Sequence, residues 1–146
     1  MSPPSPLFDE TVRDPLGQVT VSTQLDHQGL ARISVDGHGS VEGMAVAARS
    51  FEAAFARLPA DQGLHVIVDL SGLEDASLAG QLSLVPWLLR HQHRLRYLGV
   101  VGARTTALKI AQAVVQMLPF NERIGFFNDE DELKGLLKEL VASPPQ

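Results

Sequence analysis

Apolar and polar residues alternate in two short stretches near the start of the chain. In residues 18–25 and again in residues 30–35, every second residue is apolar or β-branched. This period of two predicts two strands. Residues 26–29 form a short polar connection, so the two strands are expected to pair as an antiparallel hairpin. The glycines in residues 37–39 are expected to end the second strand.

A helical pattern begins after this hairpin. Ser40 is a suitable N-cap, and Glu42 places a negative charge in the first turn, where the helix dipole favours it. Apolar residues then recur every three or four positions until Pro59: Met44, Ala48, Phe51, Phe55 and Leu58. This stripe predicts a helix with one face in the core. The nearly continuous apolar run at residues 64–70 predicts a strand that is covered on both faces.

A second helix is expected to begin near residue 76 or 77 and to end near residue 93. Pro86 lies inside it and is expected to kink it, because proline removes one backbone hydrogen bond. The predicted core stripe of this helix consists of Leu78, Leu82, Val85 and Leu89.

The remaining chain alternates twice more between strand and helix. Residues 97–101 and 124–127 predict two short strands. Between them, Thr105 or Thr106 is expected to cap a helix that faces the core with Ala107, Ala111, Val114 and Leu118. Asn128 and the acidic residues 129–132 predict the start of a last helix, whose inward residues are Leu133, Leu136, Leu137 and Leu140.

The predicted order is therefore β-β-α-β-α-β-α-β-α. Strands that alternate with helices imply a mainly parallel sheet, here five-stranded with four helices, in a single α/β domain. We expect this domain to span residues 17–142. The proline-rich residues 1–16 and residues 143–146 are expected to be disordered.

The composition excludes several classes of function but does not identify the function. The chain has 146 residues, a formal net charge of -5 and no cysteine. A negative chain is a poor partner for nucleic acid, and the absence of cysteine excludes disulfides, thiol catalysis and thiolate metal sites. No apolar run approaches the length of a membrane span, and the N-terminus has no signal-peptide pattern, so we expect a cytoplasmic protein.

The predicted order of elements, the segment from Asp69 to Leu73 and the segment from Ile124 to Leu133 together resemble the STAS superfamily, the sulfate transporter and anti-sigma-factor antagonist domains. The resemblance is to its SpoIIAA-like branch and covers roughly residues 18–141. It implies the SpoIIAA-like fold and a bacterial regulatory protein without enzymatic activity. It also implies a protein partner, such as an anti-sigma factor, a kinase-like protein or another signalling protein.

The resemblance also implies where that partner binds. In the anti-sigma-factor antagonists, the turn after this strand reads Asp-Ser-Ser/Thr-Gly, and a partner kinase phosphorylates the second hydroxyl residue. Counted from Asp69 without a gap, this motif falls on residues 77–80, where Ala79 occupies the phosphoacceptor position and has no hydroxyl. We therefore expect no phosphorylation switch at the usual position. The expected partner-binding turn comprises Leu73, Glu74, Asp75, Ser77, Leu78, Ala79 and Gly80.

Other candidate chemistry is weaker. Ser77 could accept a phosphate at a helix start, although an N-cap role explains it better. Residues 75–79 share the serine of a hydrolase nucleophile elbow but not its glycines. Residues 102–106 join a strand to a helix and resemble an anion cradle, without the glycines of a phosphate loop. The five histidines, including His91 and His93, lack ligand spacing and are interpreted as surface residues.

The alternative to a protein-interaction module is a carrier or sensor of a small apolar, lipid-like or anionic ligand. Its candidate residues are Trp87, Arg104, Thr105, Met117 and Phe120. A free pocket between the second and third helices favours this alternative, whereas an exposed apolar helix face favours a protein partner or a homodimer. We expect neither a cofactor nor a metal, and an unrecognised hydrolase ranks third.

Overall fold

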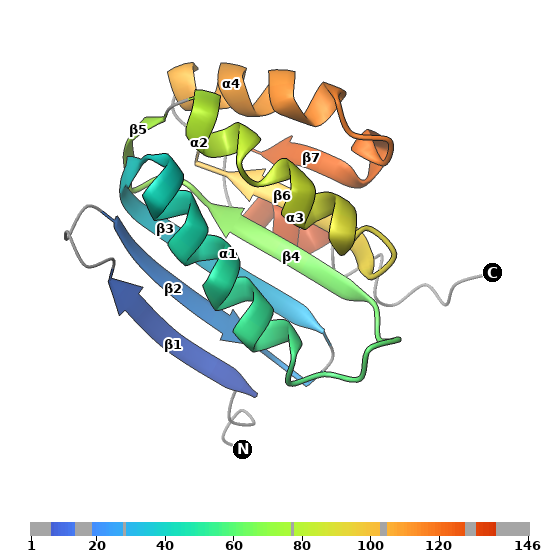
Figure 1. Cartoon of the computed structure of the whole chain (residues 1–146). Helices are drawn as coiled ribbons and strands as arrows, with labels where there is room; N and C mark the ends of the chain where they lie inside the picture. The colour runs from blue at the N-terminus through green and yellow to red at the C-terminus, as the bar shows by residue number, and fades with distance from the viewer. Residues whose placement is uncertain are drawn as a thin grey trace.

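A single mixed sheet forms the centre of the molecule (Figure 1). The computed structural model describes residues 7–13, 19–27, 29–76, 78–102, 105–127 and 131–136. Within them, seven strands pair in the order β1-β2-β3-β4-β6-β7, and β5 pairs with β3 beside this path. The pairs β1–β2 and β2–β3 are antiparallel, and the other pairs are parallel. The strands are β1 (Phe8–Arg13), β2 (Val19–Leu25), β3 (Leu30–Gly39), β4 (Leu64–Asp69), β5 (Leu73–Ala76), β6 (Leu95–Val101) and β7 (Ile124–Phe127).

Helices cover both faces of this sheet. Four of them lie across one face in Figure 1: α1 (Val41–Phe55), α2 (Leu78–Leu82), α3 (Val85–Arg90) and α4 (Thr105–Gln116). The main core lies between these helices and the sheet. Residues 131–136 are also helical, and the fully buried Leu133 packs against Ile67 and Val101 in a separate cluster. The molecule therefore has three layers, with the sheet in the middle.

The α/β fold class and the mainly parallel sheet are confirmed. The strands predicted over residues 18–25, 64–70, 97–101 and 124–127 are present as β2, β4, β6 and β7. Ser40 caps α1 as expected, because its Oγ accepts a hydrogen bond from the backbone N–H of Gly43 at 3.1 Å. The predicted cap of the last helix and its residues beyond 136 lie outside the described residues.

The expectation that residues 1–16 are disordered is wrong for Phe8–Arg13. These residues form β1 at the edge of the sheet, paired along their whole length with β2. Phe8 is 6% exposed and belongs to the core, whereas the five residues after it are exposed. An edge strand held by backbone hydrogen bonds and one buried side chain has too little apolar alternation to be recognised in the sequence.

The second strand of the hairpin does not end at residues 37–39 but continues through them. Gly37 has a φ of 112°, and the register of the pairing with β5 shifts between Gly37 and His38. A residue with a side chain would be strained at this φ, so the glycine introduces a bulge instead of a strand end. The extended part of β3 pairs with β5. The sequence does not predict strand β5.

The predicted helix near residues 76–93 is two short helices, not one kinked helix. Residues 83 and 84 form a turn between α2 and α3, and Pro86 lies at the start of α3, where a missing N–H costs little. The break changes which side chains face inward. Leu78 and Leu89 of the predicted core stripe are 53% and 37% exposed, whereas Trp87 is buried.

Candidate functional site

A fixed turn follows strand β4 at the carboxyl edge of the sheet. Asp69 accepts hydrogen bonds at Oδ1 from the N–H and the hydroxyl of Ser71, at 2.9 and 2.6 Å. Its Oδ2 accepts one from the guanidinium of Arg32 at 2.9 Å. Partial burial would raise the pKa of Asp69, but the hydrogen bonds from Ser71 and the charge of Arg32 outweigh it, so the pKa lies below its ordinary value. An ionised Asp69 thus holds the turn.

The turn leads into β5, which positions the first part of the predicted partner-binding turn. Leu73 is 3% exposed and faces the core, so it supports this segment from below. Glu74 is exposed, and its carboxylate lies 3.7 Å from Nε2 of His38 on the paired strand β3. Ser77 lies outside the described residues, as do the side chains of Asp75 and Ala76.

Helix α2 brings the second part of this turn to the surface. Leu78 is 53% exposed and Ala79 is exposed, whereas Gly80 is buried. Val41, the first residue of α1, is 43% exposed. Because β3 and β5 are parallel, the helices that follow them begin at the same edge of the sheet, and α1 and α2 are in contact. Two large apolar side chains are therefore exposed at one edge, on neighbouring helices.

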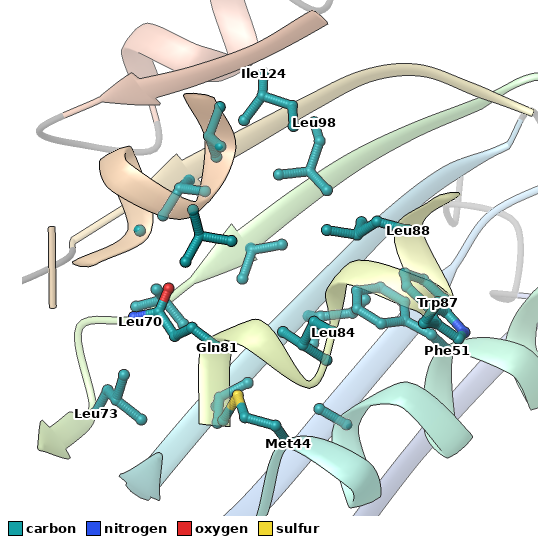
Figure 2. Close-up of a pocket in the computed structure, with 18 residues that line it drawn as sticks. Met44, Phe51, Leu70, Leu73, Gln81, Leu84, Trp87, Leu88, Leu98 and Ile124 are labelled. Atoms are coloured by element: carbon teal, nitrogen blue, oxygen red, sulfur yellow. The ribbon is translucent and has the colours of Figure 1, made fainter. Parts of the chain in front are cut away.

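An apolar cavity of about 110 Å³ lies behind α2, between the sheet and helices α1 to α4 (Figure 2). Leu70, Leu73 and Gln81 lie at one end in Figure 2, and Phe51 and Trp87 lie at the other. The rings of Phe51 and Trp87 stack with their centroids 4.9 Å apart. Of the described residues that line the cavity, all but Gln81 are apolar.

Such a void is costly to leave empty. Protein interiors pack as densely as organic crystals, and an unfilled cavity costs about 24 cal/mol per Å³. A fully enclosed cavity of this size would cost on the order of 2 to 3 kcal/mol, which is an upper bound for this partly open one. The walls include Ala47 and Ala111, whose short side chains occupy core positions of α1 and α4. These small residues are the sequence signal for the cavity, and the predicted ligand-binding set does not include them.

The structure separates the residues that the sequence proposes for ligand binding. Trp87 lines the cavity, whereas Phe120 is 2% exposed beneath the guanidinium of Arg123 and does not line it. Met117 is 67% exposed after the end of α4, on the surface. Arg104 and the side chain of Thr105 lie outside the described residues.

A polar cluster lies on the outer side of Trp87. Glu52 accepts one hydrogen bond from Arg90 at 3.0 Å and pairs with Nε2 of His91 at 3.1 Å. The hydrogen bond with His91 is the main cause that lowers the pKa of Glu52. The side chain of His91 is 16% exposed and its ring packs against Trp87, so the expectation of a surface residue is wrong for this histidine.

The described part of the chain offers neither a metal-binding cluster nor a membrane span. No group of three or more histidine, aspartate or glutamate side chains there could hold a metal ion. None of the helices in the described ranges is both long and apolar enough to cross a membrane.

Comparisons with known proteins show similarity in structure and not in sequence. No protein-family model and no curated protein matches the chain. The structure of SLC26A9, which contains a STAS domain, matches 92% of this chain with a TM-score of 0.60 and 12% identity. This chain spans about a quarter of SLC26A9, 24% of its length.

The second solved structure is similar over almost its whole length. It is an anti-sigma factor antagonist from Mycobacterium paratuberculosis, with a TM-score of 0.54 and 18% identity. The match covers 92% of this chain and 97% of the antagonist. Identities this low show the fold alone, and both matches agree with the resemblance found in the sequence. The chain has the STAS, SpoIIAA-like fold.

Proposed function

We propose that this protein is a non-enzymatic regulatory module of the STAS type that binds a signalling protein in the cytoplasm. Its contact surface is the partner-binding turn, residues 73–80, together with the start of α2. The structural similarity to an anti-sigma factor antagonist supports a regulatory partner of the anti-sigma-factor or kinase-like class.

The exposure of Leu78 is the observation that carries this proposal. A leucine that is 53% exposed in the first position of a helix leaves about half of its apolar surface in solvent. Neighbouring exposed apolar residues are typical of protein contact sites, and Val41 on the adjacent helix α1 is a second exposed apolar residue at this edge. Glu74 and His38 provide polar groups beside it, as expected for the rim of an interface.

Phosphorylation at the usual family position does not control this surface in our proposal. Ala79 is exposed on α2 but has no hydroxyl to accept a phosphate. Partner binding is then constitutive or responds to another signal.

The proposal is tested by Leu78→Asp, with Met117→Asp as the matched control. Both residues are large, apolar and more than half exposed. Helix α4 runs back across the sheet from the edge where β6 ends, so Met117 lies at the opposite edge from Leu78. An aspartate in the first turn of α2 is compatible with the helix dipole, so the fold is preserved.

The partner is first identified by affinity capture and mass spectrometry from the cells that express the protein, and is then purified. We expect Leu78→Asp to weaken its binding by about tenfold or more, the effect of losing one central interface residue. Met117→Asp should bind like the unchanged chain. If the unchanged chain, Leu78→Asp and Met117→Asp bind the partner with equal affinity, the proposed surface is wrong. If Leu78→Asp loses self-association and Met117→Asp does not, the surface is the interface of a homodimer.

A ligand carrier or sensor is the second candidate function. The cavity between α2, α3 and α4 is the specific observation that favours it. Its described lining carries no charged side chain, so it supports an apolar ligand and not an anionic one.

A further inference from the structure

The cavity behind α2 has the size and the chemistry of a binding site for a small molecule. Its volume of about 110 Å³ is somewhat below that of an engineered apolar cavity of about 150 Å³ that stays dry and binds benzene or xenon. A water molecule needs two to four polar partners, and Gln81 is the one polar side chain among the described residues of the lining. The cavity therefore favours an apolar occupant over water.

The same properties define the class of ligand. With no charged side chain in the described lining, a carboxylate or phosphate would lose its hydration without a compensating partner. The volume is too small for a long acyl chain, and the stacked rings of Phe51 and Trp87 form an aromatic wall at one end. A compact, uncharged aromatic or aliphatic molecule of about the size of benzene fits these limits.

The other end of the cavity is the inner side of the partner-binding turn. Leu73 of β5 and Gln81 of α2 contribute to the lining, and Leu78 and Ala79 lie between them in the chain. Leu84, in the turn after α2, also lines the cavity. A molecule in the cavity thus contacts Leu73 and Gln81, the residues on either side of the exposed segment.

We propose that this cavity binds a small, uncharged, apolar molecule and that its occupancy stabilises helix α2 (Leu78–Leu82) against local opening. The second half of this inference rests on the proposed function, since it gives the partner-binding turn a regulator in place of phosphorylation. A ligand that binds the folded lining and not a locally opened form shifts the population of α2 toward the folded form.

Benzene is the probe for the first half. It is titrated into the full chain while the methyl signals of Val114, Val115 and Leu84 are followed by NMR, because ring currents shift only nearby methyl groups. We expect saturable shifts at these methyl groups and a rise in the thermal midpoint of about 3 to 6 °C at ten times the Kd. The variant Val114→Phe fills the cavity and should abolish both effects.

The matched control is Val12→Phe, the same change at a valine on β1 that is 37% exposed and does not line the cavity. It should bind benzene like the unchanged chain. If Val114→Phe does not fold, the methyl shifts in the unchanged chain still show whether benzene binds in the cavity. Absence of saturable shifts there, or retained binding in a folded Val114→Phe variant, overturns the site.

Amide hydrogen exchange tests the second half on the same samples. At ten times the Kd of benzene, exchange of the amides of residues 78–82 should slow by up to about tenfold, while exchange in the edge strand β1 stays unchanged. Methyl shifts without slower exchange in residues 78–82 overturn the regulatory link and leave the ligand site. Neither result bears on the protein contact itself, which the Leu78→Asp variant tests without a ligand.

Discussion

Asp69 connects the end of a core strand to the candidate contact surface. Its carboxylate binds the backbone and the hydroxyl of Ser71 on one side and Arg32 of the neighbouring strand on the other. These donors act on the ionised form, so the fold and the ionisation of this side chain depend on each other. The turn that carries the chain toward β5 is therefore sensitive to acid.

Asp69→Asn should remove part of this stabilisation. Because the pKa of Asp69 in the folded chain lies below its ordinary value of 3.8, the folded chain binds fewer protons than the unfolded chain in this range. The stabilisation is fully present above the ordinary value and is lost as the pH falls through the folded pKa. Near neutral pH we expect the variant to lose about 1 to 2 kcal/mol in urea unfolding.

This difference between the unchanged chain and Asp69→Asn should shrink as the pH falls below 3.8. If the free energies of unfolding of the two proteins instead differ by a constant amount down to the acid transition, the ionised form of Asp69 does not stabilise the fold.

Phe55 is a fully buried aromatic residue on the core face of α1. It is 1% exposed, and its ring contacts Phe51 and Trp87 at centroid distances of 5.4 and 5.9 Å. Phe55→Ala should lower the free energy of unfolding by about 3 to 5 kcal/mol. Urea denaturation measures this loss, and a value below about 1 kcal/mol would mean that the core face of α1 is wrongly assigned.

Because Ala79 has no hydroxyl to accept a phosphate, we expect the protein to be regulated without phosphorylation of the partner-binding turn. Intact mass spectrometry and peptide mapping of protein isolated from its own cells should find no stoichiometric phosphate on residues 73–80. Phosphatase treatment should leave partner binding unchanged. Stoichiometric phosphate on Ser77, together with loss of the partner in Ser77→Asp, is the outcome that would restore a displaced form of the family switch.

At the scale of elements, the sequence predicts best where one side-chain pattern decides the structure. The stripe of α1 and the apolar run of β4 each predict their element, because burial of apolar surface is the main driving force there. The second helix shows the limit of such patterns. Its apolar spacing fits one continuous helix, but the turn at residues 83 and 84 lets α3 bury Trp87 and leaves Leu78 on the surface.

Strand β1 is the element whose importance the sequence underestimates. It covers the outer edge of β2 and buries Phe8, so it completes the sheet. Deletion of residues 1–15 should therefore lower the thermal midpoint by about 6 to 20 °C, the effect expected from losing one buried phenylalanine. Differential scanning calorimetry of the truncated and full chains compares the two midpoints, and equal midpoints would mean that β1 adds nothing to stability.

For the whole molecule, the fold could be predicted more completely than the site. The order of strands and helices predicts the parallel sheet, and the short segments near Asp69 and Ile124 point to the STAS fold. The cavity could not be predicted in the same way, because it depends on which side chains of α1, α4 and the broken helix line the same space. Trp87 is the one predicted ligand residue that the described structure places there.

One short segment, residues 73–82, lies between the proposed contact surface and the cavity. Residues 73–82 present Leu78 outward and contribute Leu73 and Gln81 to the cavity lining. A protein partner and a small ligand would thus act on the same residues from two sides. The proposed contact and the proposed regulation therefore both depend on this segment.

Hydrogen–deuterium exchange of the chain alone and in complex with its purified partner is the sharpest test of the proposed contact surface. We expect the partner to slow exchange most strongly in residues 73–82 and in the first turn of α1, at the edge where Val41 and Leu78 are exposed. Protection confined to the opposite edge, near Met117, or to strand β1, with residues 73–82 unchanged, would place the partner elsewhere and refute the proposed surface.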